Sequence, residues 1–184
     1  MKKLLLLLFI PIVCLSQNDF RKMNWGESTK SFEEKNINVD FEEYEQGLMK
    51  VYIQEGFVSG YDTLIKFFFI DNEFSAGSYH FSYKMNNKDS KDYIKDFYFM
   101  SDFLNDKYNM MRSDKWYDNG YKNSPEKLDF ALLLGEVELI EKYSGDDKDI
   151  KHFLGEEEKK LVHKLTYYSP KHNTRIDSMV KDDF

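Results

Sequence analysis

Two long stretches of alternating apolar and polar residues constrain the fold of this chain more than any other feature. They cover residues 48–84 and 128–169, and both are dense in Tyr, Phe, Leu, Ile and Val. Alternation with a period of two is typical of a strand that buries one face. Each stretch follows a segment with helical spacing. We therefore expect an α+β domain with one antiparallel sheet of about six to seven strands and two helices on one face. A duplicated αβββ unit is one arrangement that fits this order of elements.

In the first stretch, residues 48–58 read as a strand and residues 64–70 as a central strand that is apolar on both faces. Asp71 and Asn72 predict a tight turn, because both residue types tolerate the left-handed backbone. The return strand covers residues 74–83, and Gly77 within it suggests a bulge.

Two helices are expected. Ser28 can cap a short helix over residues 29–36, with Phe32 facing inward. The second helix covers residues 91–108, where apolar residues recur at spacings of one, three and four, with Asn109 just past its end. An aromatic stripe at this spacing indicates core packing rather than a cofactor site.

The second stretch predicts a strand over residues 128–143. The apolar residues occupy even-numbered positions before Gly135 and odd-numbered positions after it, which predicts a bulge or tight bend at this glycine. Just before it, Asn119-Gly120 lies between aromatic residues, which is a hairpin signal. Apolar and polar residues alternate from Ile150 to Tyr167 on both sides of a polar turn, which predicts the last hairpin.

The last hairpin also contains two histidines in an otherwise apolar pattern. If it is symmetric about Glu157 and Glu158, His152 lies directly opposite His163, with Cβ atoms about 5 Å apart. We interpret the pair as structural, with a metal or ligand contact as the alternative. Two imidazoles are fewer than the three protein ligands that a catalytic zinc usually has.

The first residues predict export. A positive start, Lys2 and Lys3, precedes an apolar run to Val13, and small residues precede a cleavage site after Ser16. This is the layout of a signal peptide over residues 1–16, followed by a single domain over 17–170 and a polar, frayed tail over 171–184. The run is too short to span a bilayer. A lipid anchor at Cys14 and a buried N-terminal element are the alternatives.

Export would leave a thiol-free and acidic protein. Cys14 is the only cysteine, so the mature chain could form no disulfide and no thiolate metal site. Loss of the two leader lysines leaves 24 basic against 33 acidic residues, a net charge of −9. Such a charge disfavours nucleic acid as a partner.

Short motifs carry a resemblance over most of the mature chain. They comprise Phe20 with Trp25-Gly26 and Ser28, then Leu104 with Lys107-Tyr108, then Trp116, and finally Tyr167 with Ser169. In these positions the chain resembles a family of exported, uncharacterised bacterial proteins, although Lys22 and Asn109 stand where the family pattern has glycine. The resemblance implies an exported α+β domain and supplies no activity.

Three functions stay open, and no catalytic residue or cofactor is indicated. The chain lacks a glycine-rich phosphate loop, a Gly-x-Ser-x-Gly elbow and a His-Glu-x-x-His helix. The first hypothesis is a binding or interaction domain of the cell envelope or exterior, whose uncovered sheet face presents Tyr52, His80 and Tyr83 to a protein or small molecule. The second is a metal-assisted or carboxylate-based hydrolase using His152 and His163. The third is a structural subunit that pairs an edge strand with another chain.

Overall fold

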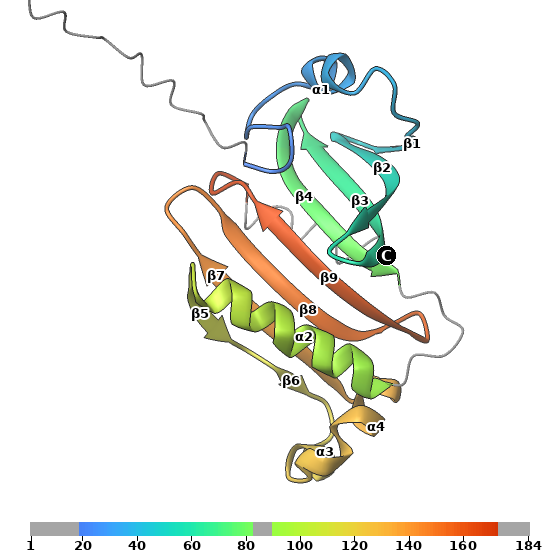
Figure 1. Ribbon diagram of the computed structural model, residues 1–184, viewed down its shortest axis with the longest axis vertical. Coiled ribbons are helices and arrows are strands. Elements are labelled where there is room, and N and C mark those ends of the chain that lie inside the picture. The colour runs from blue at the N-terminus through green and yellow to red at the C-terminus, as the bar shows by residue number, and fades with distance from the viewer. Residues whose placement is uncertain (1–18, 83–89, 173–184) are drawn as a thin grey trace, which may run out of the picture.

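One antiparallel sheet with short helices on one side makes up the structure, a computed structural model that describes residues 19–82 and 90–172 (Figure 1). In chain order its elements are α1 (Thr29–Lys35), β1 (Glu42–Gln46), β2 (Met49–Val58), β3 (Tyr61–Ile70), β4 (Glu73–Ser82), α2 (Ser90–Asn105), β5 (Asn109–Arg112), β6 (Lys115–Trp116), α3 (Asn119–Lys122), a 3-10 turn (Pro125–Lys127), α4 (Leu128–Leu133), β7 (Val137–Ser144), β8 (Asp149–Glu157) and β9 (Lys160–Tyr168).

The sheet joins two antiparallel blocks. The strand order is β1-β2-β3-β4-β9-β8-β7-β5, and β6 pairs with β7 at the side of this path. The first block, β1 to β4, meets the second where β4 pairs with β9. In Figure 1, α1 lies at the end of the first block, and α2 runs along the strands of the second block. Both stretches of alternation thus contribute strands to a single sheet, although residues 128–133 are not part of it.

The expected count of six to seven strands and two helices is wrong. The described residues form nine strands and four α-helices, so the protein is more sheet-dominated than predicted. The missed strands explain the difference. All five residues of β1 and all four of β5 are exposed, so neither strand carries an alternating apolar pattern.

The strand predicted over residues 128–143 is also wrong at its start, because residues 128–133 form α4. Gly135 is the residue that ends this helix, with φ of +70°, and is not a bulge. The N–H of Gly135 bonds to Leu132 O, and the N–H of Glu136 bonds to Ala131 O. This pair of bonds is the Schellman motif, which favours glycine in the left-handed position.

The hairpin predicted at Asn119-Gly120 does not form. The side chain of Asp118 accepts from the N–H of Gly120 and caps a short helix, α3. A side-chain acceptor just before the Asn-Gly pair satisfies the backbone as a helix start.

Other local predictions are confirmed. Ser28 caps α1 by accepting from the N–H of Ser31, and Phe32 is buried. Asp71 and Asn72 form the turn between β3 and β4 with φ of 52° and 65°.

The bulge expected at Gly77 lies instead beside Phe68 and Phe69, where the β3–β4 register shifts. Gly77 makes room for another residue: a Cβ there would meet the ring of Phe20.

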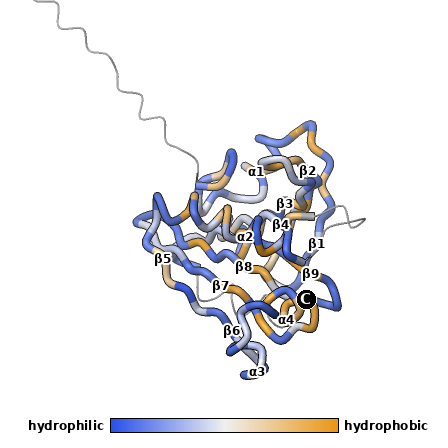
Figure 2. Tube along the Cα trace, turned by 60° about the horizontal axis from the view of Figure 1, so that its bottom comes forward, coloured by the Kyte–Doolittle hydropathy of each residue, from blue (hydrophilic) through white to orange (hydrophobic). Residues whose placement is uncertain are grey.

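Two apolar clusters hold the helices to the same side of the sheet. Phe32 of α1 packs against Tyr52 and Phe67, and Phe97 of α2 packs against the second block. Figure 2 shows hydrophobic and hydrophilic stretches interspersed along the trace of the sheet. None of the described helices packs on the other side of the sheet, which we call the open face.

Candidate functional site

The open face carries a row of polar side chains across four neighbouring strands. Phe67 and Leu165 face the helices, so Lys66 and Thr166, the residues beside them in sequence, face the other way. Lys66 pairs with Ser78 of β4, Ser78 with Thr166 of β9, and Thr166 with Lys151 of β8. Paired residues have side chains about 5 Å apart, so the row is continuous.

A hollow of about 220 Å³ opens over this row. Its lining combines apolar, hydroxyl, basic and acidic side chains. These are Phe68, Val162 and Tyr168, then Ser78 and Thr166, then Lys66, His80, Lys160 and Lys164, and finally Glu157 and Glu158. The hydroxyl oxygens of Ser78 and Thr166 are hydrogen-bonded at 2.9 Å. Small-molecule sites commonly combine an apolar lining with a few convergent polar groups.

The basic groups of the hollow influence one another. Burial lowers the pKa of Lys66, the nearby ammonium of Lys164 lowers it further, and Glu157 acts in the opposite direction. Burial, followed by the charges of Lys66 and Lys164, places the pKa of His80 well below its ordinary value. His80 is therefore a neutral imidazole at pH 7. The ammonium of Lys164 is paired with the carboxylate of Glu157.

Of the residues expected on the uncovered face, only His80 can be placed there. Tyr52 lies on the helix-covered side with 1% of its surface exposed, and its hydroxyl donates to Glu33 Oε1 at 2.6 Å. The expectation for Tyr52 is wrong because β2 is apolar on both faces, so alternation alone does not identify the covered side. Tyr83 lies outside the described residues.

His152 and His163 are in contact, but in a different register from the predicted one. His163 pairs with Leu154, and His152 pairs with Leu165. The turn residues are Glu158 and Lys159, with φ of 50° and 64°, so the centre of the hairpin lies one residue later than assumed. The rings nevertheless meet diagonally, with their Nε2 atoms 2.8 Å apart. Diagonal neighbours remain within reach of long side chains.

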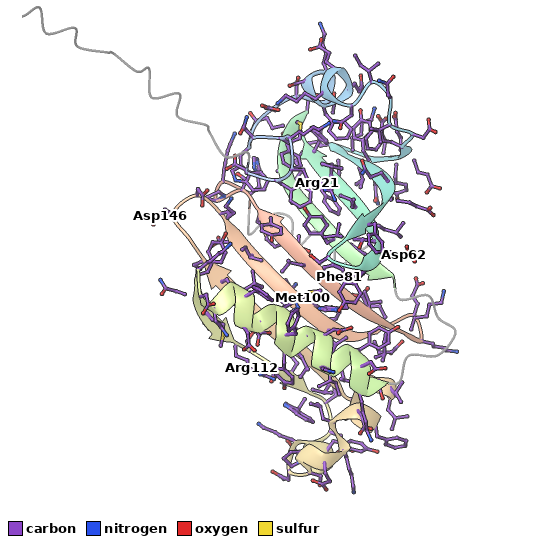
Figure 3. All side chains as sticks on the ribbon, viewed as in Figure 1. Arg21, Asp62, Phe81, Met100, Arg112 and Asp146 are labelled. Atoms are coloured by element: carbon purple, nitrogen blue, oxygen red, sulfur yellow. The ribbon has the colours of Figure 1, made fainter. Side chains whose placement is uncertain are left out.

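A buried network surrounds this pair. Nδ1 of His152 lies 3.3 Å from Glu141 Oε2, which also accepts from Ser101 Oγ at 2.5 Å and from the Tyr143 hydroxyl at 2.7 Å. Phe97 stacks on His152 with ring centroids 4.0 Å apart. Two residues labelled in Figure 3 lie at the ends of the network. Phe81 packs on His163, and Arg112 Nη1 lies 3.8 Å from Glu141 Oε1.

The network changes the acidity of its members. Burial lowers the pKa of His152, against the opposing effect of Glu141. Burial raises the pKa of Glu141, but hydrogen bonds from His152, Ser101 and Tyr143 outweigh it, so the pKa lies below its ordinary value. The carboxylate is therefore ionised at neutral pH, and His152 is held as a neutral ring.

This arrangement can share a proton and offers little to a substrate. Both imidazoles are 0% exposed, and neither lines the hollow over the polar row of the open face. Within that part of the chain, no group of three His, Cys, Asp or Glu side chains could hold a metal ion. The geometry gives no support to the hydrolase hypothesis.

Sequence reasoning missed the polar row of the open face. One signal was present: Lys66 is the single charged residue in the otherwise apolar run of residues 64–70. A charged residue breaks the continuous apolar run that is typical of a strand buried on both faces.

The comparisons with known proteins give no relative. No family model, no curated protein and no solved structure matches the chain. The resemblance to exported bacterial proteins therefore stays a prediction. In the described ranges, no helix is long and apolar enough to cross a bilayer.

Proposed function

We propose that the protein is an exported binding domain that takes up a small ligand in the hollow of its open face. The observation that carries this proposal is the hollow itself, which is lined by three lysines, a histidine, two glutamates, the hydroxyl groups of Ser78 and Thr166, and apolar side chains. The signal-peptide pattern of residues 1–16 supports the exported location.

The scaffold suits this role. The hollow lies on β3, β4 and β9, which are central strands of the sheet. Their other side is packed against the helix-covered clusters, so the side chains of the row are held by hydrogen-bonded strands rather than by loops. Sites on regular elements hold their geometry more closely than sites on loops.

Nuclear magnetic resonance tests the proposal without knowledge of the ligand. A set of small ring compounds, both neutral and charged, is titrated into the 15N-labelled protein. We expect the largest chemical-shift changes at backbone amides of β3, β4 and β9 around Ser78 and Thr166. Compounds that bind nowhere, or that shift amides only on the helix-covered side, would contradict the proposal.

A matched pair of variants locates the site. Thr166→Phe places a ring in the hollow and should abolish the shifts. Lys142→Phe adds the same ring to β7, outside the residues that line the hollow, and should leave the shifts unchanged. Shifts that persist in Thr166→Phe would mean that the hollow is not the site.

A further inference from the structure

We infer that the segment of residues 173–184 docks on the open face of the sheet and covers an apolar cluster of β2, β3, β4 and β9. Three observations point to this contact within one molecule: the burial of the cluster, the place where the described chain ends, and the spacing of apolar residues in the segment.

Six apolar residues of the open face are almost completely buried, with at most 6% of their surface exposed. Phe68 and Ile70 follow Lys66 at steps of two along β3, so they lie on the same side of the sheet. The others pair with them across the sheet, directly or through one strand. This open-face cluster consists of Met49 and Val51 of β2, Phe68 and Ile70 of β3, Ala76 of β4 and Tyr168 of β9.

The sheet alone does not account for this burial. Side chains of a strand stand roughly perpendicular to the sheet, so their neighbours cover the flanks and leave the tips to solvent. The one further apolar residue described as packing on the cluster is Ile53, which belongs to β2 itself. Within residues 19–82 and 90–172, the helices pack on the opposite side. The low exposure therefore points to a covering layer from another part of the chain.

The described chain ends beside the cluster. Directly after β9, the N–H of Ser169 bonds to Ser75 O, and the N–H of His172 bonds to Ser169 O at 2.9 Å. His172 is 7% exposed, and its Nε2 lies 3.9 Å from Glu73 Oε2. Glu73 is the cross-strand partner of Ile70, a member of the cluster. Residue 173 therefore begins next to the cluster.

The other two stretches outside the description begin elsewhere. Residues 1–18 lead to Phe20, which packs on the helix-covered side. Residues 83–89 follow Ser82, at the end of β4 that lies away from the cluster. Position therefore favours residues 173–184 as the covering segment.

The segment has the apolar residues and the length that the contact requires. Ile176, Met179, Val180 and Phe184 recur at spacings of three, one and four, a pattern that gives a helix one apolar side. Twelve residues span ~18 Å as a helix and ~40 Å when extended. Four neighbouring strands span roughly 14 Å. The segment can therefore reach across the whole cluster.

The docked segment would also border the hollow. Phe68 and Tyr168 belong both to the open-face cluster and to the lining of the hollow. Docking nevertheless requires no ligand, so its test is separate from that of the proposed binding function.

Nuclear Overhauser effects test the contact in the full protein. With 13C-labelled methyl groups, we expect cross-peaks from Ile176 and Val180 to the ring of Phe68 and the methyl groups of Val51. If no residue of 173–184 gives a cross-peak to the open-face cluster, the inference is overturned. Cross-peaks from the segment to the helix-covered side alone would overturn it as well.

A sample that mixes labelled with unlabelled protein tests whether a second copy covers the cluster. We expect the cross-peaks to arise within one molecule and to stay unchanged when the protein is diluted. Cross-peaks found only between labelled and unlabelled chains would mean that two molecules share the contact, which contradicts the inference.

Paired substitutions measure the contribution of the contact. Ile176→Ser with Val180→Ser removes two apolar side chains from the segment, so the midpoint of urea unfolding should fall and the ring signals of Phe68 should shift. Ser178→Ala with Lys181→Gln changes the other side of the same segment and should leave both readouts unchanged. If Ile176→Ser with Val180→Ser changes neither readout, the segment does not cover the cluster and the inference is wrong.

Discussion

His152 Nε2 and His163 Nε2 lie 2.8 Å apart, and neither ring is exposed. A hydrogen bond between two ring nitrogens requires one donor and one acceptor, so only one hydrogen atom fits between them. If both Nε2 atoms were protonated, two N–H groups would point at each other. The pair therefore stabilises the folded state only while one Nε2 remains unprotonated.

Acid should destabilise the protein through this pair. The pKa of His152 is lowered by burial from its ordinary 6.5, so below about pH 6.5 the unfolded chain binds a proton that the folded chain does not. Stability then falls as the pH falls, by up to ~1.4 kcal/mol per pH unit for each such proton. Below pH 4.5 the lowered pKa of Glu141 adds a loss in the same direction.

Urea unfolding between pH 8 and pH 4 measures this slope. His80 has a lowered pKa as well, so it contributes with the same sign. His152→Gln and His80→Gln should each reduce the slope between pH 6.5 and pH 5. A slope that neither substitution changes would show that other groups cause the acid sensitivity.

Loss of the Glu141 carboxylate should be among the most destabilising polar substitutions. Glu141 is 2% exposed and accepts from three side chains, those of Ser101, Tyr143 and His152. Glu141→Gln weakens these bonds and puts an amide hydrogen among donors, which should cost about 2–3 kcal/mol. Glu42→Gln in the exposed strand β1 is the control, with a change within ~0.5 kcal/mol. Equal effects of the two substitutions in thermal unfolding would contradict the importance of the network.

The buried hydroxyl of Tyr52 should matter more than an exposed one. Burial, then the hydrogen bond to Glu33, raises the pKa of Tyr52 to about 12, against the opposing effect of Lys50. Tyr52→Phe should cost about 1 kcal/mol, because the bond to Glu33 is lost. Tyr117 also donates to a carboxylate, that of Glu138, but is 60% exposed, so Tyr117→Phe should be nearly neutral. Unfolding in urea compares the two, and an equal loss for both would argue against a special role of Tyr52.

The successes and failures of sequence reasoning have physical causes. Helix α2 and the Asp71–Asn72 turn depend on local patterns, and these were found. Helix α4 was missed because Leu128 and Leu132 are separated by four residues, a spacing that fits both a strand and a helix. Strands β1 and β5 have exposed residues throughout, so they leave no periodic signal.

The candidate site was harder to predict than the fold. His152 and His163 were paired correctly as neighbours, although the register was wrong, because two non-glycine residues form the left-handed turn at Glu158 and Lys159. The hollow depends on which side of the sheet the helices cover. Strand β2 buries residues on both faces, as Val51 and Tyr52 show, so its sequence alone does not decide that question.

Gly135 gives the last prediction, because its backbone and its neighbour both oppose a side chain. With φ of +70° the position is strained for any L-residue, and a Cβ there would lie 2.8 Å from Glu156 Oε2. Gly26 has a similar φ of +83° but open space around it. Gly26→Ala should cost about 1–2 kcal/mol from the backbone alone. Gly135→Ala should cost at least as much, since Glu156 must also move, and thermal unfolding compares the two. The double variant Gly135→Ala with Glu156→Ala should recover only the part of the lost stability that comes from the contact with Glu156. A Gly135→Ala protein as stable as the parent would mean that the Schellman motif does not hold the end of α4.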